Sequence, residues 1–159
     1  MKIRLICVGK IKESFFKQAI DEYSKRLQRY INLEIVEVPD EKAPDTLSAN
    51  EEIAVKQKEG EKILKHIKQD EFLVCLDILG KQMTSEEFSS FFHNKASCGI
   101  SKINLVIGGS LGLSKEVLDR SDFSVSFSKM TFPHQLMRVV LLEQIYRAMR
   151  IAKNEPYHK

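Results

Sequence analysis

The sequence has few cysteines: Cys7, Cys75 and Cys98 are the whole set, and no Cys-x-x-Cys pair occurs. An odd number of cysteines without zinc-type Cys/His spacing argues against a disulfide framework and against a zinc site. Cys7 and Cys75 lie in apolar, strand-like segments, where cysteine usually behaves as a small buried hydrophobic residue. We therefore expect no bound metal.

Long hydrophobic runs are also missing. No segment approaches the roughly 20 apolar residues that a membrane-spanning helix needs. The apolar N-terminal segment is short, and Lys10, Lys12 and Glu13 interrupt it before any small-residue cleavage site, which is unlike a signal peptide. The sequence therefore predicts a soluble, cytoplasmic protein that does not interact with membranes.

A strong excess of one charge is absent as well. The formal net charge is +3 and the pI is about 8.7, which is compatible with RNA binding but does not indicate it. No repeat or low-complexity linker divides the 159 residues, of which 43% are hydrophobic. We expect one domain, residues 1–159, with a single substantial core.

Short β-branched segments alternate along the chain with amphipathic ones. Capping-box spacing marks the start of two helices, at Ser48 with Glu51 and at Thr84 with Glu87. Alternating strands and helices predict an α/β fold with a mostly parallel sheet flanked by helices. The expected strands are 2–8, 33–38, 72–76, 103–107 and 123–127, and the expected helices are 13–30, 48–67, one beginning at Thr84, 114–120, and one with Pro133 in its first position.

Unusual residues follow three of the expected strands, in segments 76–81, 107–113 and 127–133. Ligands of open α/β sheets bind beyond the carboxyl ends of strands, so these segments predict one shared pocket. The motif Gly108-Gly109-x-x-Gly112 lacks the spacing of a dinucleotide fingerprint and has no acidic residue about 20 positions later, which disfavours a Rossmann-type enzyme. Its glycines indicate either a tight turn or close backbone approach to a ligand.

The last expected helix carries four consecutive apolar residues, 139–142, which point all around a helix. Such a helix must be buried on more than one side. Homodimerisation explains that burial, and an unusually central position in the fold is the alternative. The tail that follows combines Tyr157, His158 and Lys159, side chains suited to base stacking, proton transfer and phosphate contact.

Several motifs together resemble the RlmH family, the ribosomal RNA large subunit methyltransferases H of the SPOUT superfamily. They are the segment 106–113, Pro-His-x-x-x-Arg at 133–138, the segment 143–148 and Pro-Tyr-His at 156–158. The likeness extends over residues 1–159. It implies a deep C-terminal trefoil knot, a homodimer and S-adenosylmethionine as cofactor. The cofactor-binding residues that it implies are Leu76, Gly108, Phe127, Ser128, Lys129, Met130, Thr131 and Phe132.

The family's reaction is methyl transfer to N3 of a pseudouridine in the helix 69 loop of large-subunit rRNA, within the assembled ribosome. His158 and His134 are the expected proton acceptors, Arg138 would stabilise developing negative charge, and Tyr157 would stack on the base. Two alternatives remain at this point: a SPOUT enzyme with another target, and a non-catalytic ribosome- or RNA-binding protein. Expected phosphate contacts are Arg138, Arg147, Arg150, Lys153 and Lys159.

Overall fold

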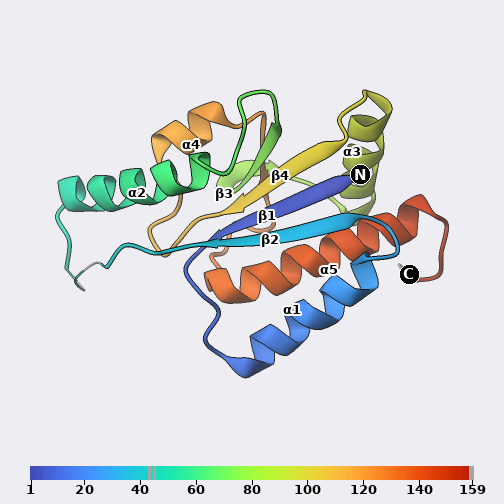
Figure 1. Cartoon of the computed structure of the whole chain (residues 1–159), viewed down its shortest axis with the longest axis horizontal. Coiled ribbons are helices and arrows are strands. Elements are labelled where there is room, and N and C mark those ends of the chain that lie inside the picture. The colour runs from blue at the N-terminus through green and yellow to red at the C-terminus, as the bar shows by residue number, and fades with distance from the viewer. Residues whose placement is uncertain (43, 45, 158–159) are drawn as a thin grey trace.

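A five-stranded, entirely parallel sheet forms the centre of the protein, in the strand order β2-β1-β4-β3-β5 (Figure 1). The computed structural model describes residues 1–42, 44 and 46–157. The parallel α/β fold expected from the sequence is confirmed. The strands are β1 (Lys2–Val8), β2 (Asn32–Val38), β3 (Phe72–Gln82), β4 (Lys102–Ile107) and β5 (Phe123–Ser126); the helices are α1 (Ser14–Leu27), α2 (Ala49–Leu64), α3 (Ser85–Ser97), α4 (Lys115–Arg120) and α5 (His134–Ala152).

Helices cover both faces of the sheet. In Figure 1, α1 and α5 lie on one side of the strands, and α2 and α4 on the other. The first face holds the larger core, in which apolar side chains of α1, α3 and α5 pack on β1 and β4. The second core joins α2 and α4 to the opposite side of the same strands. This explains why β1 and β4 are almost continuously apolar: both of their faces are buried.

Local sequence signals set the helix boundaries. Both predicted capping boxes are present, with Ser48 and Thr84 each accepting from the backbone of the glutamate three residues later. Gly60, in the interior of α2, has a packing role. A Cβ atom there would lie 2.3 Å from Ser114 Oγ, so glycine allows α2 to approach the start of α4 closely.

Most element boundaries lie within three residues of the prediction, and two differences affect the site. Pro133 does not occupy the first position of the last helix; it is the N-cap residue, with its carbonyl accepting from Met137 N at 3.0 Å. Strand β3 continues to Gln82 instead of ending at Leu76, because residues 77–80 bulge out and pairing with β5 resumes at Lys81. A single-sequence pattern does not reveal such a bulge, because pairing with β5 is a long-range interaction.

The burial of α5 has an explanation within one chain. Helix α5 packs against both α1 and α3 and against β4, which makes it the central helix of its layer. Leu141 and Leu142 are fully buried there, whereas Val139 and Val140 are only partly buried. The four-residue apolar run therefore does not by itself require a second subunit. Among the described residues, no helix is long and apolar enough to cross a membrane.

Candidate active site

A cavity of about 850 Å³ opens at the carboxyl ends of β3, β4 and β5. That volume lies within the range of small-molecule and cofactor sites. Its apolar floor includes Leu76, Ile107, Val125 and Met137, and its walls are the three segments that the sequence marks as unusual. The wall residues are Asp77, Ile78 and Leu79 after Leu76, Gly108 to Leu113 after β4, and Phe127, Ser128, Met130, Thr131, Phe132, Pro133 and His134 before and at the start of α5.

The glycine-rich wall is a tight turn. Gly112 has a φ of +85°, and its N–H donates to Gly109 O at 3.1 Å. A Cβ atom on Gly108 would lie 2.8 Å from the Gly112 carbonyl carbon, and one on Gly109 would lie 2.9 Å from Glu59 Oε2. The tight turn predicted from the glycine motif is confirmed. Gly108 also lines the cavity, and its close approach to a ligand stays a prediction.

Glu59 supports this turn from behind. Its carboxylate is only 5% exposed and accepts from Glu41 N at 3.0 Å. Burial raises the pKa of this carboxyl group. The Glu59-Gly60 pair therefore links α2 both to the glycine-rich turn and to α4.

The opposite wall of the cavity is formed by residues 127–133. Hydrogen bonds of two serines stabilise its conformation. Ser126 Oγ donates to Ser128 O at 2.9 Å, and Met130 N donates to Ser128 Oγ at 2.9 Å. The Phe127 ring packs edge-on against Phe88, with centroids 5.9 Å apart. These contacts hold an irregular segment in one shape, so that its backbone groups are available to a ligand.

Of the predicted catalytic residues that the structure describes, only His134 lines the cavity. It is the first residue of α5 and is partly buried. Burial, followed by the nearby charge of Arg138, lowers the pKa of its imidazole below the usual value, and the carboxylates of Asp40 and Glu13 oppose that effect. His134 is therefore neutral near pH 7, the form that can accept a proton.

Arg138 lies one turn along α5 and is 1% exposed. Its guanidinium donates to Val8 O and Gly9 O, both at 2.7 Å, and ion-pairs with Glu37 at 2.8 Å. Arg138 does not line the cavity; it joins α5 to the carboxyl ends of β1 and β2. Its Nε is buried and has no hydrogen-bond partner among the described residues.

Tyr157 follows α5 and folds back against the middle of the helix. Its partners there, Glu143 and Tyr146, are about 14 to 18 Å along α5 from His134, so one chain does not bring Tyr157 into contact with its own His134. The Tyr157 hydroxyl donates to Glu143 Oε1 at 3.2 Å, and its ring packs edge-on against Tyr146. Burial raises the pKa of Tyr157 to about 12, so the hydroxyl stays protonated and acts as a donor.

The remaining predicted residues divide into three groups. Lys129 is exposed and does not line the cavity. Arg150 pairs with Glu155 at 2.8 Å and donates to Pro156 O, which secures the tail, and Arg147 pairs with Glu143 at 2.6 Å. Lys153 is exposed, and His158 and Lys159 lie outside the described residues.

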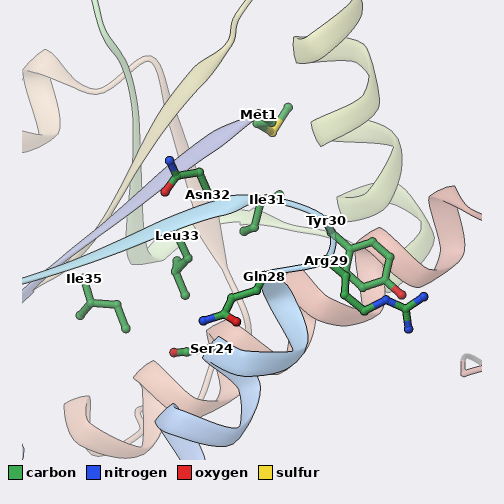
Figure 2. Close-up of a pocket in the computed structure, with 9 residues that line it drawn as sticks. All are labelled: Met1, Ser24, Gln28, Arg29, Tyr30, Ile31, Asn32, Leu33 and Ile35. Carbon is green, nitrogen blue, oxygen red and sulfur yellow. The ribbon is translucent and has the colours of Figure 1, made fainter.

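A second cavity, of about 700 Å³, lies near the amino ends of β1 and β2 (Figure 2). Arg29 and Tyr30 stand beside α5 in that view, and Tyr30 donates its hydroxyl hydrogen to Glu155. This cavity therefore borders the C-terminal tail and lies at the opposite edge of the sheet from the first cavity. Its lining residues are Met1, Ser24, Gln28, Arg29, Tyr30, Ile31, Asn32, Leu33 and Ile35.

The sequence predicts segment 76–81 in the shared pocket, and Asp77, Ile78 and Leu79 do line the cavity. What it does not predict is the bulge in β3 that turns these residues towards the cavity. The apolar Ile78 and Leu79 are 46% and 89% exposed. Their position directly after a buried strand was the available signal. The described residues contain no group of His, Cys, Asp or Glu side chains arranged to hold a metal ion.

Comparison with known proteins identifies this arrangement. A model of the family described as predicted SPOUT methyltransferases matches residues 1–158. The ribosomal RNA large subunit methyltransferase H 1 of Clostridium perfringens (strain SM101 / Type A) is 59% identical over 159 residues, covering 100% of both chains. The chain belongs to the RlmH family of SPOUT methyltransferases.

Other relatives agree with that membership. The RlmH proteins of Clostridium novyi (strain NT) and Clostridium botulinum (strain 657 / Type Ba4) are 60% and 61% identical, again over 100% of both chains. The resemblance seen in the sequence motifs is thereby confirmed. A Rossmann-type nucleotide enzyme is excluded by the same membership.

Solved structures share the fold at low identity. A probable methyltransferase from Bordetella pertussis Tohama I superposes with a TM-score of 0.58 at 11% identity, over 93% of this chain and 96% of that one. A probable methylase family protein from Haemophilus influenzae Rd KW20 gives 0.55 at 14%, over 99% and 70%. A putative methyltransferase from Legionella pneumophila, solved with bound S-adenosylmethionine, gives 0.50 at 11%, over 96% and 66%.

Proposed function

We propose that this protein transfers a methyl group from S-adenosylmethionine to N3 of a pseudouridine in the helix 69 loop of large-subunit rRNA, in the assembled ribosome and hence in the cytoplasm. Membership of the RlmH family supports the reaction and the class of substrate. One observation carries the assignment of the site. All the cofactor residues that the resemblance implies, except Lys129, line a single cavity.

The cavity suits this cofactor. Leu76, Ile107 and Met137 offer an apolar surface for the adenine ring, and the backbone of residues 127–132 offers hydrogen-bonding groups to its edge. The turn at Gly108 brings the backbone close to the cavity. Bound there, S-adenosylmethionine supplies an electrophilic methyl group, so the protein's main task is to orient the accepting nitrogen and to remove its proton.

His134 is the proton acceptor in this proposal. The N3–H of pseudouridine is a weakly acidic imide, and its proton must leave as the new N–C bond forms. A neutral imidazole at the cavity wall can take that proton. Asp40 and Glu13 favour the imidazolium that results, because both carboxylates raise the pKa of His134.

Arg138 supports the base from behind the wall. Its charge acts on His134, and its buried Nε is a donor with no partner among the described residues. Three of its other contacts hold β1 and β2 against α5. We infer that Arg138 positions His134 and contributes positive potential to the cavity.

The tail requires a second subunit to take part in the reaction. Tyr157 lies beside Glu143 and Tyr146, which are about 14 to 18 Å along α5 from His134 at the cavity, and it does not line the cavity of its own chain. A homodimer in which α5 of one subunit lies near the cavity of the other would supply Tyr157 to the target base. The partly buried Val139 and Val140 on α5 could contribute their exposed parts to such an interface. The trefoil knot implied by the family remains part of this proposal.

Methyl transfer from labelled S-adenosylmethionine tests the proposal. Assembled ribosomes, free large subunits and naked rRNA are prepared from a strain lacking this gene, and the product is mapped by mass spectrometry. A single N3-methylpseudouridine, formed mainly in assembled ribosomes, is expected. A methyl group on another nucleotide would indicate a different RNA target, and cofactor binding without transfer to any of the three would indicate a non-catalytic ribosome-binding protein.

A further inference from the structure

Asp77 is the only carboxylate among the described residues that line the cofactor cavity. The other charged or titratable lining residues are Lys56 and His134. Asp77 is partly buried, and no hydrogen bond or ion pair within the described part of the chain engages its carboxylate. The described salt bridges of this protein use other acidic residues, so Asp77 keeps its full capacity as an acceptor.

A bulge in β3 places Asp77 at the cofactor cavity. Leu76 and Lys81 of β3 both pair with Val125 of β5, so residues 77–80 are looped out of the sheet. Bulges of this kind redirect side chains, and they recur beside active sites. The bulge lies tightly against β5, because a Cβ atom on Gly80 would be 2.7 Å from the Val125 carbonyl carbon.

The cofactor has donor groups that a carboxylate in the cavity could accept hydrogen bonds from. The apolar floor and the backbone of residues 127–132 account for an adenine ring. S-adenosylmethionine also carries two ribose hydroxyl groups and an ammonium group, which are donors that need acceptors when they leave water. A carboxylate accepts such hydrogen bonds more strongly than a neutral group does.

We propose that Asp77 is a cofactor-binding residue, whose carboxylate accepts hydrogen bonds from O–H or N–H groups of S-adenosylmethionine. The inference rests on the proposed function, because it assumes that this cavity holds the cofactor. The ribose hydroxyls and the methionine ammonium share the relevant chemistry, and truncated ligands distinguish them.

Titration calorimetry on the purified full-length protein tests the proposal, with Asp77→Asn as the isosteric variant. A lost charge-assisted hydrogen bond is expected to raise the Kd for S-adenosylmethionine and S-adenosylhomocysteine by about 10- to 100-fold. Asp21→Asn, on the exposed side of α1, is the matched control and is expected to bind as the wild type does. Thermal unfolding of Asp77→Asn without ligand shows that the variant is folded.

Methylthioadenosine, which keeps the ribose and lacks the amino-acid group, locates the contact. An equal loss of affinity for it assigns Asp77 to the ribose, and an unchanged affinity assigns Asp77 to the ammonium group. If Asp77→Asn binds all three ligands with wild-type affinity, the inference is wrong while the proposed function stands. If the wild-type protein itself binds neither S-adenosylmethionine nor S-adenosylhomocysteine, both are wrong.

Discussion

The guanidinium of Arg138 and the carboxylate of Glu37 form an ion pair at 2.8 Å across 101 positions of sequence, with the arginine fully buried. The pair joins the first turn of α5 to β2, and the same guanidinium joins α5 to the end of β1. Glu37 keeps access to water, with 36% of its side chain exposed, so loss of Arg138 acts mainly on the Val8 and Gly9 carbonyls, which lose their buried donor.

We therefore expect Arg138→Met to lower the free energy of unfolding by about 3 kcal/mol, because two buried carbonyl groups lose their donor. Denaturant unfolding measures this change. Lys153→Met, on an exposed residue at the end of the same helix, is the control and should have little effect. A variant at Arg138 with wild-type stability and no methyl transfer would instead show that its role is confined to the reaction.

Gly108→Val is expected to abolish binding of S-adenosylmethionine. A side chain at Gly108 would collide with the Gly112 backbone, so the turn that forms one wall of the cavity must distort. Calorimetry measures the affinity. Gly99→Ala is the control, since no atom lies within 4 Å of a Cβ atom there, although its φ of +82° makes the alanine mildly strained. Unchanged affinity in Gly108→Val would remove the glycine-rich turn from the cofactor site.

The pH dependence of methyl transfer reports on His134. If its neutral form accepts the proton, kcat/KM is constant near neutral pH and falls as the pH drops through the pKa of His134, which burial and Arg138 place below the usual value. His134→Gln should lower the rate by about 10²- to 10⁴-fold and remove this acidic limb. His93→Gln, on an exposed residue of α3, should preserve both rate and profile. An acidic limb that persists in His134→Gln would assign the base to another group.

The same shift has a consequence for stability. The pKa of His134 is lower in the folded protein, so protons bind the unfolded chain more readily. The contribution of His134 is fully present above the pKa of the unfolded chain and is lost as the pH falls below it. As the pH falls from about 7 to about 5, the unfolding free energy of the wild type should therefore decrease relative to that of His134→Gln.

Deletion of residues 157–159 should leave the affinity for S-adenosylmethionine unchanged and lower methyl transfer to ribosomes by at least about 100-fold. Tyr157 packs against Glu143 and Tyr146 and does not line the cavity of its own chain, so cofactor binding is expected to be independent of it, whereas misplacement of a target base is costly. Full turnover by the truncated protein would show that the tail takes no part in methyl transfer.

Mixing variants tests whether two subunits share one site. Co-expressed His134→Gln and tail-deleted chains should regain part of the wild-type rate, because a mixed dimer contains one cavity with an intact His134 facing an intact tail. Each variant alone is the control. A mixture as inactive as its components would place base and tail on the same chain.

The sequence predicts the framework well and the site only in part. The strands and capped helices follow from local patterns, and capping boxes at Ser48 and Thr84 depend on residues only three positions apart. The bulge that carries Asp77 depends instead on pairing with β5, 40 or more residues away, and was not predictable. The position of Arg138 behind the cavity wall also depends on β1 and β2. Its place in the sequence motif therefore indicates stabilisation of negative charge or a phosphate contact, and not the buried hydrogen bonds that it makes.

The strand order has a consequence for how the chain is made. β1 pairs with β4 in a register that joins Lys2 to Lys102, so a strand that emerges first waits for a neighbour 100 residues later. At ordinary rates of translation this delay is about 5 to 20 s. During that interval β1 can pair with β2 alone, and one of its edges stays open to other strands. Biosynthesis, rather than the finished protein, is therefore the stage at which this chain is most exposed to aggregation, and α5, made last, closes the larger core.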